Sequence, residues 1–184
     1  MGSCGTTANA LAFGGNTGSP TTATEEWTGS GAPVGAWATA NNLNTARQAM
    51  GGCGIATAAL AAGGETPAPA TPTNSFEYDG TSFTASGALI EATVNAGAGG
   101  IQTAALTFGK SNNSRPTAVQ GYDGTSFSTR PSIATGRAQM ASGKNASTAE
   151  LTWMAGGYTT TVVANTEEFT GETTAANIKT FSTS

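Results

Sequence analysis

The sequence contains no histidine, only two cysteines and few charged side chains, which make up 10% of its 184 residues. Without histidine, a Ser-His-Asp triad and the zinc sites that use imidazole ligands are excluded. Seven basic residues against eleven acidic ones give a net charge of −4, so the chain lacks the basic surface that binds nucleic acid. We therefore expect no nucleic-acid partner, no metal and no cofactor.

Cys4 and Cys53 are too few for a metal site with four protein ligands. Both stand beside glycine, and we expect buried thiols in preference to a disulfide, with their redox state left open. No signal peptide is seen, because the first residues lack a basic segment followed by an apolar run. No run of 18 apolar residues is present, so no membrane insertion is expected.

Bulky aliphatic and aromatic residues are also scarce, while Ala, Thr, Gly and Ser fill more than half of the chain. Thr and Gly disfavour helix interiors, and no segment has the composition of a strong helix. So few bulky residues would indicate disorder if the net charge were high, which it is not. The composition therefore predicts an all-β protein of one domain with many short strands.

The chain contains four copies of one sequence pattern. A Gly/Ala-rich segment that ends in a hydrophobic-Gly-Gly block recurs every 46 to 49 residues. Its copies span residues 1–15, 50–64, 96–110 and 140–157. A landmark aromatic residue follows each copy, and these residues are Trp27, Tyr78, Tyr122 and Phe169. In the second and third copies Asp-Gly-Thr-Ser-Phe follows, at residues 79–83 and 123–127, where Asp-Gly predicts a hairpin turn.

Each copy has room for four short antiparallel strands, and a period of about 45 residues is typical of β-propeller blades. A single sheet of this size cannot bury its faces, so the unit must recur and pack against its neighbours. We predict an all-β fold, a β-propeller of four four-stranded antiparallel blades in a single domain, residues 1–184. The blades are expected at about residues 1–46, 47–93, 94–136 and 137–184. Two alternatives remain open: part of a larger ring, and half of an eight-bladed ring made by two chains.

Small residues are expected along the axis of the propeller, where the innermost strands crowd together. These strands are placed at residues 1–5, 49–54, 95–101 and 138–144, and the last strand of the fourth blade at residues 177–181. Bulky residues recur once in each blade, and we expect them between the blades. They are the landmark aromatics together with Leu11, Leu60, Leu106 and Leu151.

This combination of features resembles a degenerate kelch repeat. The features are the hydrophobic-Gly-Gly block, an aromatic followed by Asp, then Phe or Trp, and Thr-Ala-Arg47 or Thr-Gly-Arg137 before the next Gly-rich strand. Phrases such as Thr-Ala-Ala-Leu-Ala-Ala-Gly-Gly and Tyr-Asp-Gly-Thr-Ser-Phe resemble more closely the kelch-like arrays in structural and tail-fibre proteins of marine bacteriophages. The resemblance covers the whole chain and implies a propeller on a virion or in another extracellular location. Copy three departs from the pattern at Lys110, which replaces the second glycine, and at Val94, which replaces the recurrent arginine; copy four lacks the Asp-Gly turn.

No enzyme constellation is present in the sequence. The adjacent glutamates at 25–26 and at 167–168 point to opposite faces of a strand, so neither pair can act together as acid and base. Asp79 and Asp123 are better explained by turn geometry than by catalysis. A sialidase-like glycoside hydrolase needs an arginine cluster beside a tyrosine, whereas the four arginines are scattered. We therefore expect no enzymatic activity and no catalytic residue, with such a hydrolase as the least favoured alternative.

Four residues are candidates for ligand binding. Arg47 and Arg137 recur at equivalent positions before an innermost strand, where they either satisfy carbonyl groups at the mouth of the ring or bind a ligand. Tyr158 follows the Gly-Gly block of copy four and is suited to stack on a sugar ring. Arg115 lies in the corresponding loop of copy three.

These candidates favour a structural or adhesion module without enzymatic activity. Its loops vary on a uniform scaffold, which is where recognition usually resides. We predict that one loop face binds a host surface glycan or another virion protein. A spacer or assembly domain without a ligand, and a homo-oligomer, remain open as alternatives.

Overall fold

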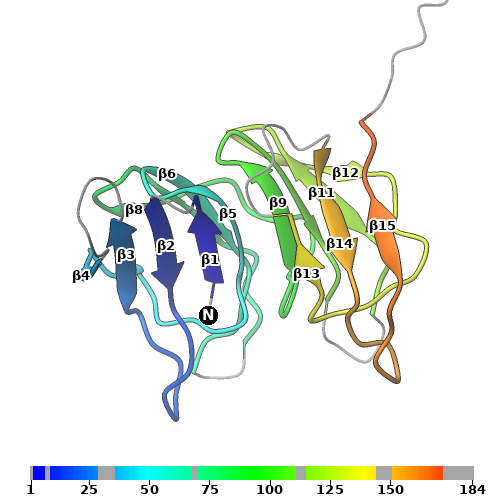
Figure 1. The fold of residues 1–184 in the computed structure, drawn as a ribbon, viewed down its shortest axis with the longest axis horizontal. Coiled ribbons are helices and arrows are strands. Elements are labelled where there is room, and N and C mark those ends of the chain that lie inside the picture. Colours follow the sequence, from blue (N-terminus) through cyan, green and yellow to red (C-terminus); the bar gives the residue numbers. More distant parts are fainter. Residues whose placement is uncertain are drawn as a thin grey trace, which may run out of the picture.

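β-strands and their connecting loops make up the part of the chain that the computed structural model describes. The described residues are 2–6, 9–28, 36–67, 70–110, 115–143 and 151–171. They form four antiparallel sheets arranged as the blades of a propeller, which confirms the predicted architecture (Figure 1).

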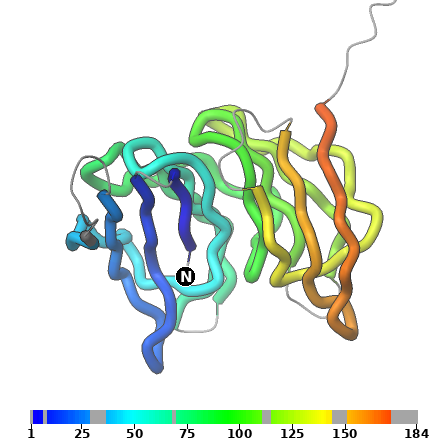
Figure 2. The backbone as a smooth tube through the Cα atoms, in the orientation of Figure 1, coloured from blue at the N-terminus to red at the C-terminus, as the bar shows by residue number. Residues whose placement is uncertain are grey.

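The strands follow one another in chain order within every blade, and the chain completes one blade before it enters the next (Figure 2). Blade 1 contains β1 (Gly2–Gly5), β2 (Asn9–Phe13), β3 (Thr24–Thr28) and β4 (Ala36–Thr39). Blade 2 contains β5 (Gly51–Ile55), β6 (Ala58–Ala62), β7 (Ser75–Tyr78) and β8 (Phe83–Ala85). Blade 3 contains β9 (Gly97–Ile101), β10 (Ala104–Phe108), β11 (Val119–Tyr122) and β12 (Phe127–Arg130). Blade 4 contains β13 (Ala141–Ser142), β14 (Trp153–Ala155) and β15 (Thr166–Glu168); the strand predicted at residues 177–181 lies outside the described residues.

Backbone hydrogen bonds near the axis join blades 2, 3 and 4. Ala49, Asn95 and Gln139 each stand two residues before an innermost strand, and all three adopt left-handed φ angles of 58°, 54° and 57°. The Asn95 N–H donates to the Ala49 carbonyl at 2.9 Å, and the Gln139 N–H donates to the Asn95 carbonyl at 3.0 Å. A left-handed conformation is uncommon for residues other than glycine. Its recurrence in three different residue types indicates that the blade-to-blade hydrogen bonds impose it.

Glycines on the innermost strands make room for large rings. Phe13 is fully buried, and its ring lies against Gly2 of its own blade and Gly52 of blade 2. A Cβ atom on Gly52 would lie 2.6 Å from Phe13 Cζ, closer than real side chains approach. Gly97 and Phe108 repeat the arrangement in blade 3. The predicted enrichment of small residues at the axis is therefore confirmed, and these glycines serve close packing.

Hydrophobic clusters fill the junctions, where a junction is the interface between two consecutive blades. Leu11 and Phe13 of blade 1 pack with Tyr78 and Phe83 of blade 2. The second junction contains Leu60, Ala62, Ala105, Tyr122 and Phe127, and the third contains Leu106, Phe108, Val119 and Met154 with Phe169 beside them. Each blade thus has a forward face, which in blades 1 to 3 lies against the next blade, and an opposite, backward face, which in blades 2 to 4 lies against the preceding blade.

Most bulky residues predicted between the blades are buried there. Leu11, Leu60 and Leu106 are at most 2% exposed, and Tyr78 and Tyr122 are buried, whereas Trp27 and Phe169 are only partly buried. The prediction for Leu151 was wrong, because this side chain is 67% exposed. β14 begins only at Trp153, and its Met154 supplies the buried contact with blade 3 instead.

The Asp-Gly segments form the predicted tight turns. Asp79 Oδ1 accepts the backbone N–H groups of Thr81 at 2.8 Å and Ser82 at 2.7 Å, and Gly80 supplies the positive φ of 89°. Asp123 repeats these contacts in blade 3. The backbone donors of Ser82 and Thr81 hold the pKa of Asp79 below its usual range. Both aspartates are therefore turn residues.

Tyrosine–glutamate hydrogen bonds cross two of the junctions. Tyr78 Oη in blade 2 donates to Glu26 Oε1 in blade 1 at 2.6 Å. Tyr122 Oη in blade 3 donates to Glu77 Oε1 in blade 2 at 2.5 Å. The third junction has neither residue. Phe169, the residue directly after β15, stands in blade 4 where Tyr122 stands in blade 3. Gly121 stands in blade 3 where Glu77 stands in blade 2. Donor and acceptor are thus present together or absent together.

The first prediction concerns this hydrogen bond. Tyr78→Phe should lower the free energy of unfolding by about 1–2 kcal/mol, because a hydrogen bond to a carboxylate is lost while ring packing is kept. Urea titration followed by circular dichroism measures it. Tyr158→Phe, at a 38% exposed tyrosine, is the matched control and should change stability little. Equal loss in both variants would contradict the assigned role of the junction hydrogen bond.

The second prediction concerns alkaline pH. Burial, together with the hydrogen bond to Glu77, raises the pKa of Tyr122 to about 12, from an ordinary value of 10.0. The folded state thus holds this proton more tightly than the unfolded state, so its contribution to stability is complete below pH 10 and declines as pH rises towards 12. Tyr122→Phe should therefore show a shallower loss of stability than the unmodified chain over this range. Parallel pH profiles in the two proteins would refute the assignment.

Candidate functional site

The loop face is the end of the blades that carries the connections from the second to the third strand of each blade, at the bottom of Figure 1. It comprises residues 14–23, 63–67, 70–74, 109–110, 115–118 and 156–165, with the segments that lead into the next blade at Arg47, Thr93 and Arg137. All four candidate binding residues belong to this face.

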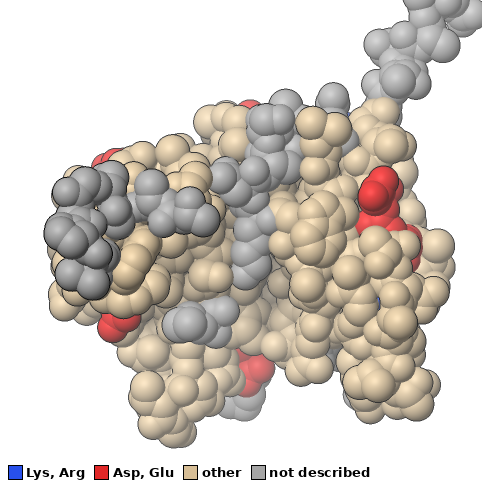
Figure 3. All heavy atoms as spheres, viewed as in Figure 1, with Lys and Arg blue, Asp and Glu red and all other residues tan. Residues whose placement is uncertain are grey.

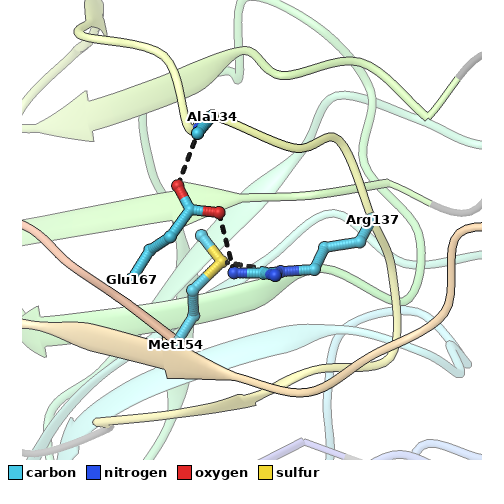
Figure 4. Close-up of polar contacts among 4 residues, drawn as sticks. All are labelled: Ala134, Arg137, Met154 and Glu167. Carbon is cyan, nitrogen blue, oxygen red and sulfur yellow. Dashed lines mark hydrogen bonds and ion pairs between the residues drawn. The ribbon is translucent and has the colours of Figure 1, made fainter. Parts of the chain in front are cut away.

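Arg137 is fully buried where the chain passes from blade 3 to blade 4. Its Nη2 atom forms an ion pair with Glu167 Oε1 at 2.8 Å, and its Nε atom donates to Met154 Sδ at 3.4 Å (Figure 4). Glu167 Oε2 accepts the backbone N–H of Ala134 at 2.7 Å (Figure 4). The guanidinium therefore ties the connecting segment to β14 and β15 of blade 4 through groups of the protein itself.

Arg47 is 3% exposed and holds the junction of blades 1 and 2 by neutral groups. Nη1 donates to the Gly63 carbonyl and Nη2 to Asn74 Oδ1, both at 3.0 Å. The guanidinium carbon lies 5.1 Å from the centre of the Phe76 ring, a cation–π distance. Burial lowers the pKa of Arg47 from its ordinary value. The alternative in which this arginine satisfies carbonyl groups at the mouth of the ring matches its contacts.

Thr93 is the residue of blade 3 that stands where Arg47 and Arg137 stand in blades 2 and 4. The prediction of Val94 for this position was wrong by one residue. The Thr93 carbonyl accepts the N–H of Gly64, as the Arg47 carbonyl accepts the N–H of Gly15. Thr93 has no guanidinium, and the Gln120 side chain of β11 instead ties the segment that leads into blade 3 to that blade. Its Oε1 atom accepts the N–H groups of Ile90 and Glu91 at 2.7 and 3.1 Å, and its Nε2 atom donates to the Glu91 carbonyl at 3.0 Å.

Arg115 and Tyr158 are brought together by the fold. The Arg115 guanidinium carbon lies 4.9 Å from the centre of the Tyr158 ring. The Tyr158 backbone is fixed by two hydrogen bonds with Ala138, at 2.9 and 3.1 Å. The Arg115 carbonyl lies so close to Gly136 that a Cβ atom there would overlap with it. This pair therefore has a built position, while the Tyr158 side chain stays 38% exposed.

A polar group on the other half of the loop face was missed from the sequence. Asn16 Nδ2 donates to Gln48 Oε1 at 2.5 Å, and Gln48 Nε2 donates to Glu65 Oε1 at 3.3 Å. Asn16 and Glu65 directly follow a Gly-Gly block, as Tyr158 does. This shared position could have revealed the group from the sequence, because the residue after the Gly-Gly block lies at the same point of its blade in each copy.

Two hollows lie elsewhere on the described surface. One, of about 220 Å³, lies between blades 3 and 4 and is lined by Leu106, Phe108, Ile133, Met154, Glu167 and Phe169 among others. The other, of about 260 Å³, lies near the axis beside the innermost strands of blades 2, 3 and 4. Both are smaller than the roughly 300–1,000 Å³ of ordinary small-molecule sites. An exposed loop surface therefore fits recognition better than either hollow.

Cys4 and Cys53 are both buried and form no disulfide, as predicted for thiols in the core. Across the described ranges, no group of three or more His, Cys, Asp or Glu side chains is placed to hold a metal ion. Nor does this part of the chain contain a helix that is long and apolar enough to cross a membrane.

No protein-family model matches the chain, and no curated protein matches it either. The propeller arrangement is therefore established by the structure. Within it, two of the four candidate residues serve the junctions, and the other two form a pair in which Tyr158 is exposed and Arg115 is partly buried.

The third prediction separates these two roles. Arg137→Ala should lower the free energy of unfolding by about 3 kcal/mol, because Glu167 loses its partner within a largely buried pair. Arg115→Ala is the matched control and should cost less, because this side chain is only partly buried and its cation–π contact with Tyr158 contributes about 1 kcal/mol. Thermal unfolding of both variants provides the comparison. A neutral Arg137→Ala variant would mean that this arginine does not hold the junction.

Proposed function

We propose that this protein is a non-enzymatic recognition module of the kelch-like type, carried on a virion appendage, which binds a surface glycan through its loop face. The observation that supports it best is the exposed Tyr158 ring with the Arg115 guanidinium at 4.9 Å. The kelch-like and phage-like phrases of the sequence support the setting.

The pair has the chemistry of a sugar site. An aromatic ring offers an apolar face on which the C–H groups of a sugar ring can stack. A guanidinium offers several N–H donors in a fixed plane, which suit hydroxyl or carboxylate oxygens. Arg115 lies against the ring, so stacking and hydrogen bonding would act on one ligand at one place.

The carboxylates that the sequence analysis singled out support binding without catalysis. Glu167, one of the carboxylates that the sequence placed in adjacent pairs, is engaged by Arg137 and by the Ala134 N–H. Asp79 and Asp123 are engaged by the N–H groups of their own turns. These carboxylates are thus held by donors of the protein itself.

The fourth prediction tests this site. On an array of immobilised neutral and acidic glycans the protein should bind a restricted set, and affinity for the best glycan should fall at least about tenfold in Tyr158→Ala and in Arg115→Ala, equivalent to about 1.4 kcal/mol or more. Val162→Ala, at an 84% exposed side chain of the same loop, is the matched control and should bind normally. Isothermal titration calorimetry with the selected glycan gives the affinities.

Unchanged affinity in both Tyr158→Ala and Arg115→Ala would exclude this pair as the site. Absence of binding to any glycan by the folded protein would reject the glycan proposal and favour the second candidate, an assembly domain. The exposed aromatic residues of blades 1 and 4 give that candidate an observation of its own.

A further inference from the structure

The backward face of blade 1 carries an aromatic pair in which one ring is exposed and the other is partly buried. Trp27 of β3 and Trp37 of β4 lie opposite each other in the sheet, with ring centres 5.7 Å apart, and Trp37 is 51% exposed. The corresponding pairs, Tyr78–Phe83 and Tyr122–Phe127, have ring centres 4.7 and 4.8 Å apart and are buried against the preceding blade. Blade 1 thus presents an element that is covered in blades 2 and 3.

The forward face of blade 4 is exposed in the same way. Trp153 is 41% exposed, whereas Leu11, Leu60 and Leu106, the residues at the same position of the second strand, are buried under the next blade. Glu168 lies opposite Trp153 in the sheet and is exposed. In the other blades this place belongs to Glu26, Glu77 and Gly121.

The two faces are complementary in the same way as the faces that meet at the first two junctions. Glu26 and Glu77 each accept a hydrogen bond from the aromatic residue of the next blade. Glu168 is an acceptor of the same kind, and Trp27 stands at the position of that aromatic donor, with an indole N–H that can only donate. Small residues at Ala10 and Ala12 of blade 1 correspond to Ala59 and Ala61, which receive Leu11 and Phe13 in the first junction.

The arrangement of the blades brings both faces to one side of the molecule. Blades 2 and 3 lie behind blades 1 and 4 in Figure 1, so the backward face of blade 1 and the forward face of blade 4 both look toward the viewer. Few charged side chains are seen on this side (Figure 3). All three tryptophans of the chain, Trp27, Trp37 and Trp153, belong to these two faces.

We propose that these faces bind a second copy of this chain head to tail, so that two chains close one ring of eight blades. Turning a copy by half a turn about the vertical direction of Figure 1 and placing it in front sets its blade 1 against blade 4, and its blade 4 against blade 1. In both new junctions Trp27 of one chain donates to Glu168 of the other, while Trp153 and Trp37 become buried. The assembly is independent of any ligand on the loop face.

The fifth prediction is the oligomeric state of the full chain. Size-exclusion chromatography with light scattering, run over a concentration series, should give twice the chain mass of 18.1 kDa. Tryptophan emission should move to the blue as the dimer forms, because every tryptophan lies at the junction. A monomer at all concentrations, or an unlimited ladder of higher oligomers, would overturn the closed two-chain ring.

Interface variants test the head-to-tail order. Trp37→Glu and Trp153→Glu should each raise the dimer dissociation constant about thirtyfold or more, as expected for a central tryptophan. An equal mixture of the two should regain dimers, because a mixed dimer has one junction in which both faces are unaltered. Val162→Glu, on the loop face, is the control and should remain dimeric, while circular dichroism of all three variants should match that of the unmodified chain.

Two results would count against this order. If either tryptophan variant alone stays fully dimeric, that face is outside the interface. If mixing restores nothing although both variants are folded, like faces meet and the head-to-tail pairing is wrong. Glu168→Gln keeps the shape of the side chain and should weaken the dimer severalfold, since the acceptor loses its charge.

Discussion

The packing of a large side chain from one blade onto glycine and alanine of the next is the contact on which the whole structure depends. Phe13 occupies space that opens only because Gly52 has no side chain, and Leu11 meets Ala59 and Ala61. A sheet of this composition has too little bulk to bury itself. Its two faces become a core only when neighbours lie within reach, so the fold is a property of consecutive blades and not of any single blade.

The sequence was sufficient to predict features that are local or that recur at a fixed period. The Gly/Ala-rich inner strands and the Asp-Gly turns have local causes, steric and conformational, so their places followed from residue type. The period of the pattern gave the number of blades. Leu151 shows the limit, because the additional residues of the fourth copy shift which side chain reaches the junction, and this depends on pairing that no local pattern reveals.

The residues of the candidate site could be chosen from the sequence, but their contacts could not. Arg47 and Arg137 share a motif, yet one is held by a carbonyl, an amide and a ring and the other by a carboxylate. Their partners lie between 16 and 30 residues further along the chain, so the sequence left their role open between structure and binding. Arg115 and Tyr158 are 43 positions apart, and only the stacking of blades 3 and 4 makes them neighbours.

The matched presence of glutamate and tyrosine across the junctions has a consequence for how such a chain can change over generations. Tyr78 and Glu26 are 52 positions apart and belong to different copies of the repeat, yet loss of one leaves the other without its partner. Gly121 and Phe169 show the state in which both have gone. The unit under selection is therefore the boundary between two copies, and duplication or deletion of a blade preserves the protein only when the newly joined boundaries agree.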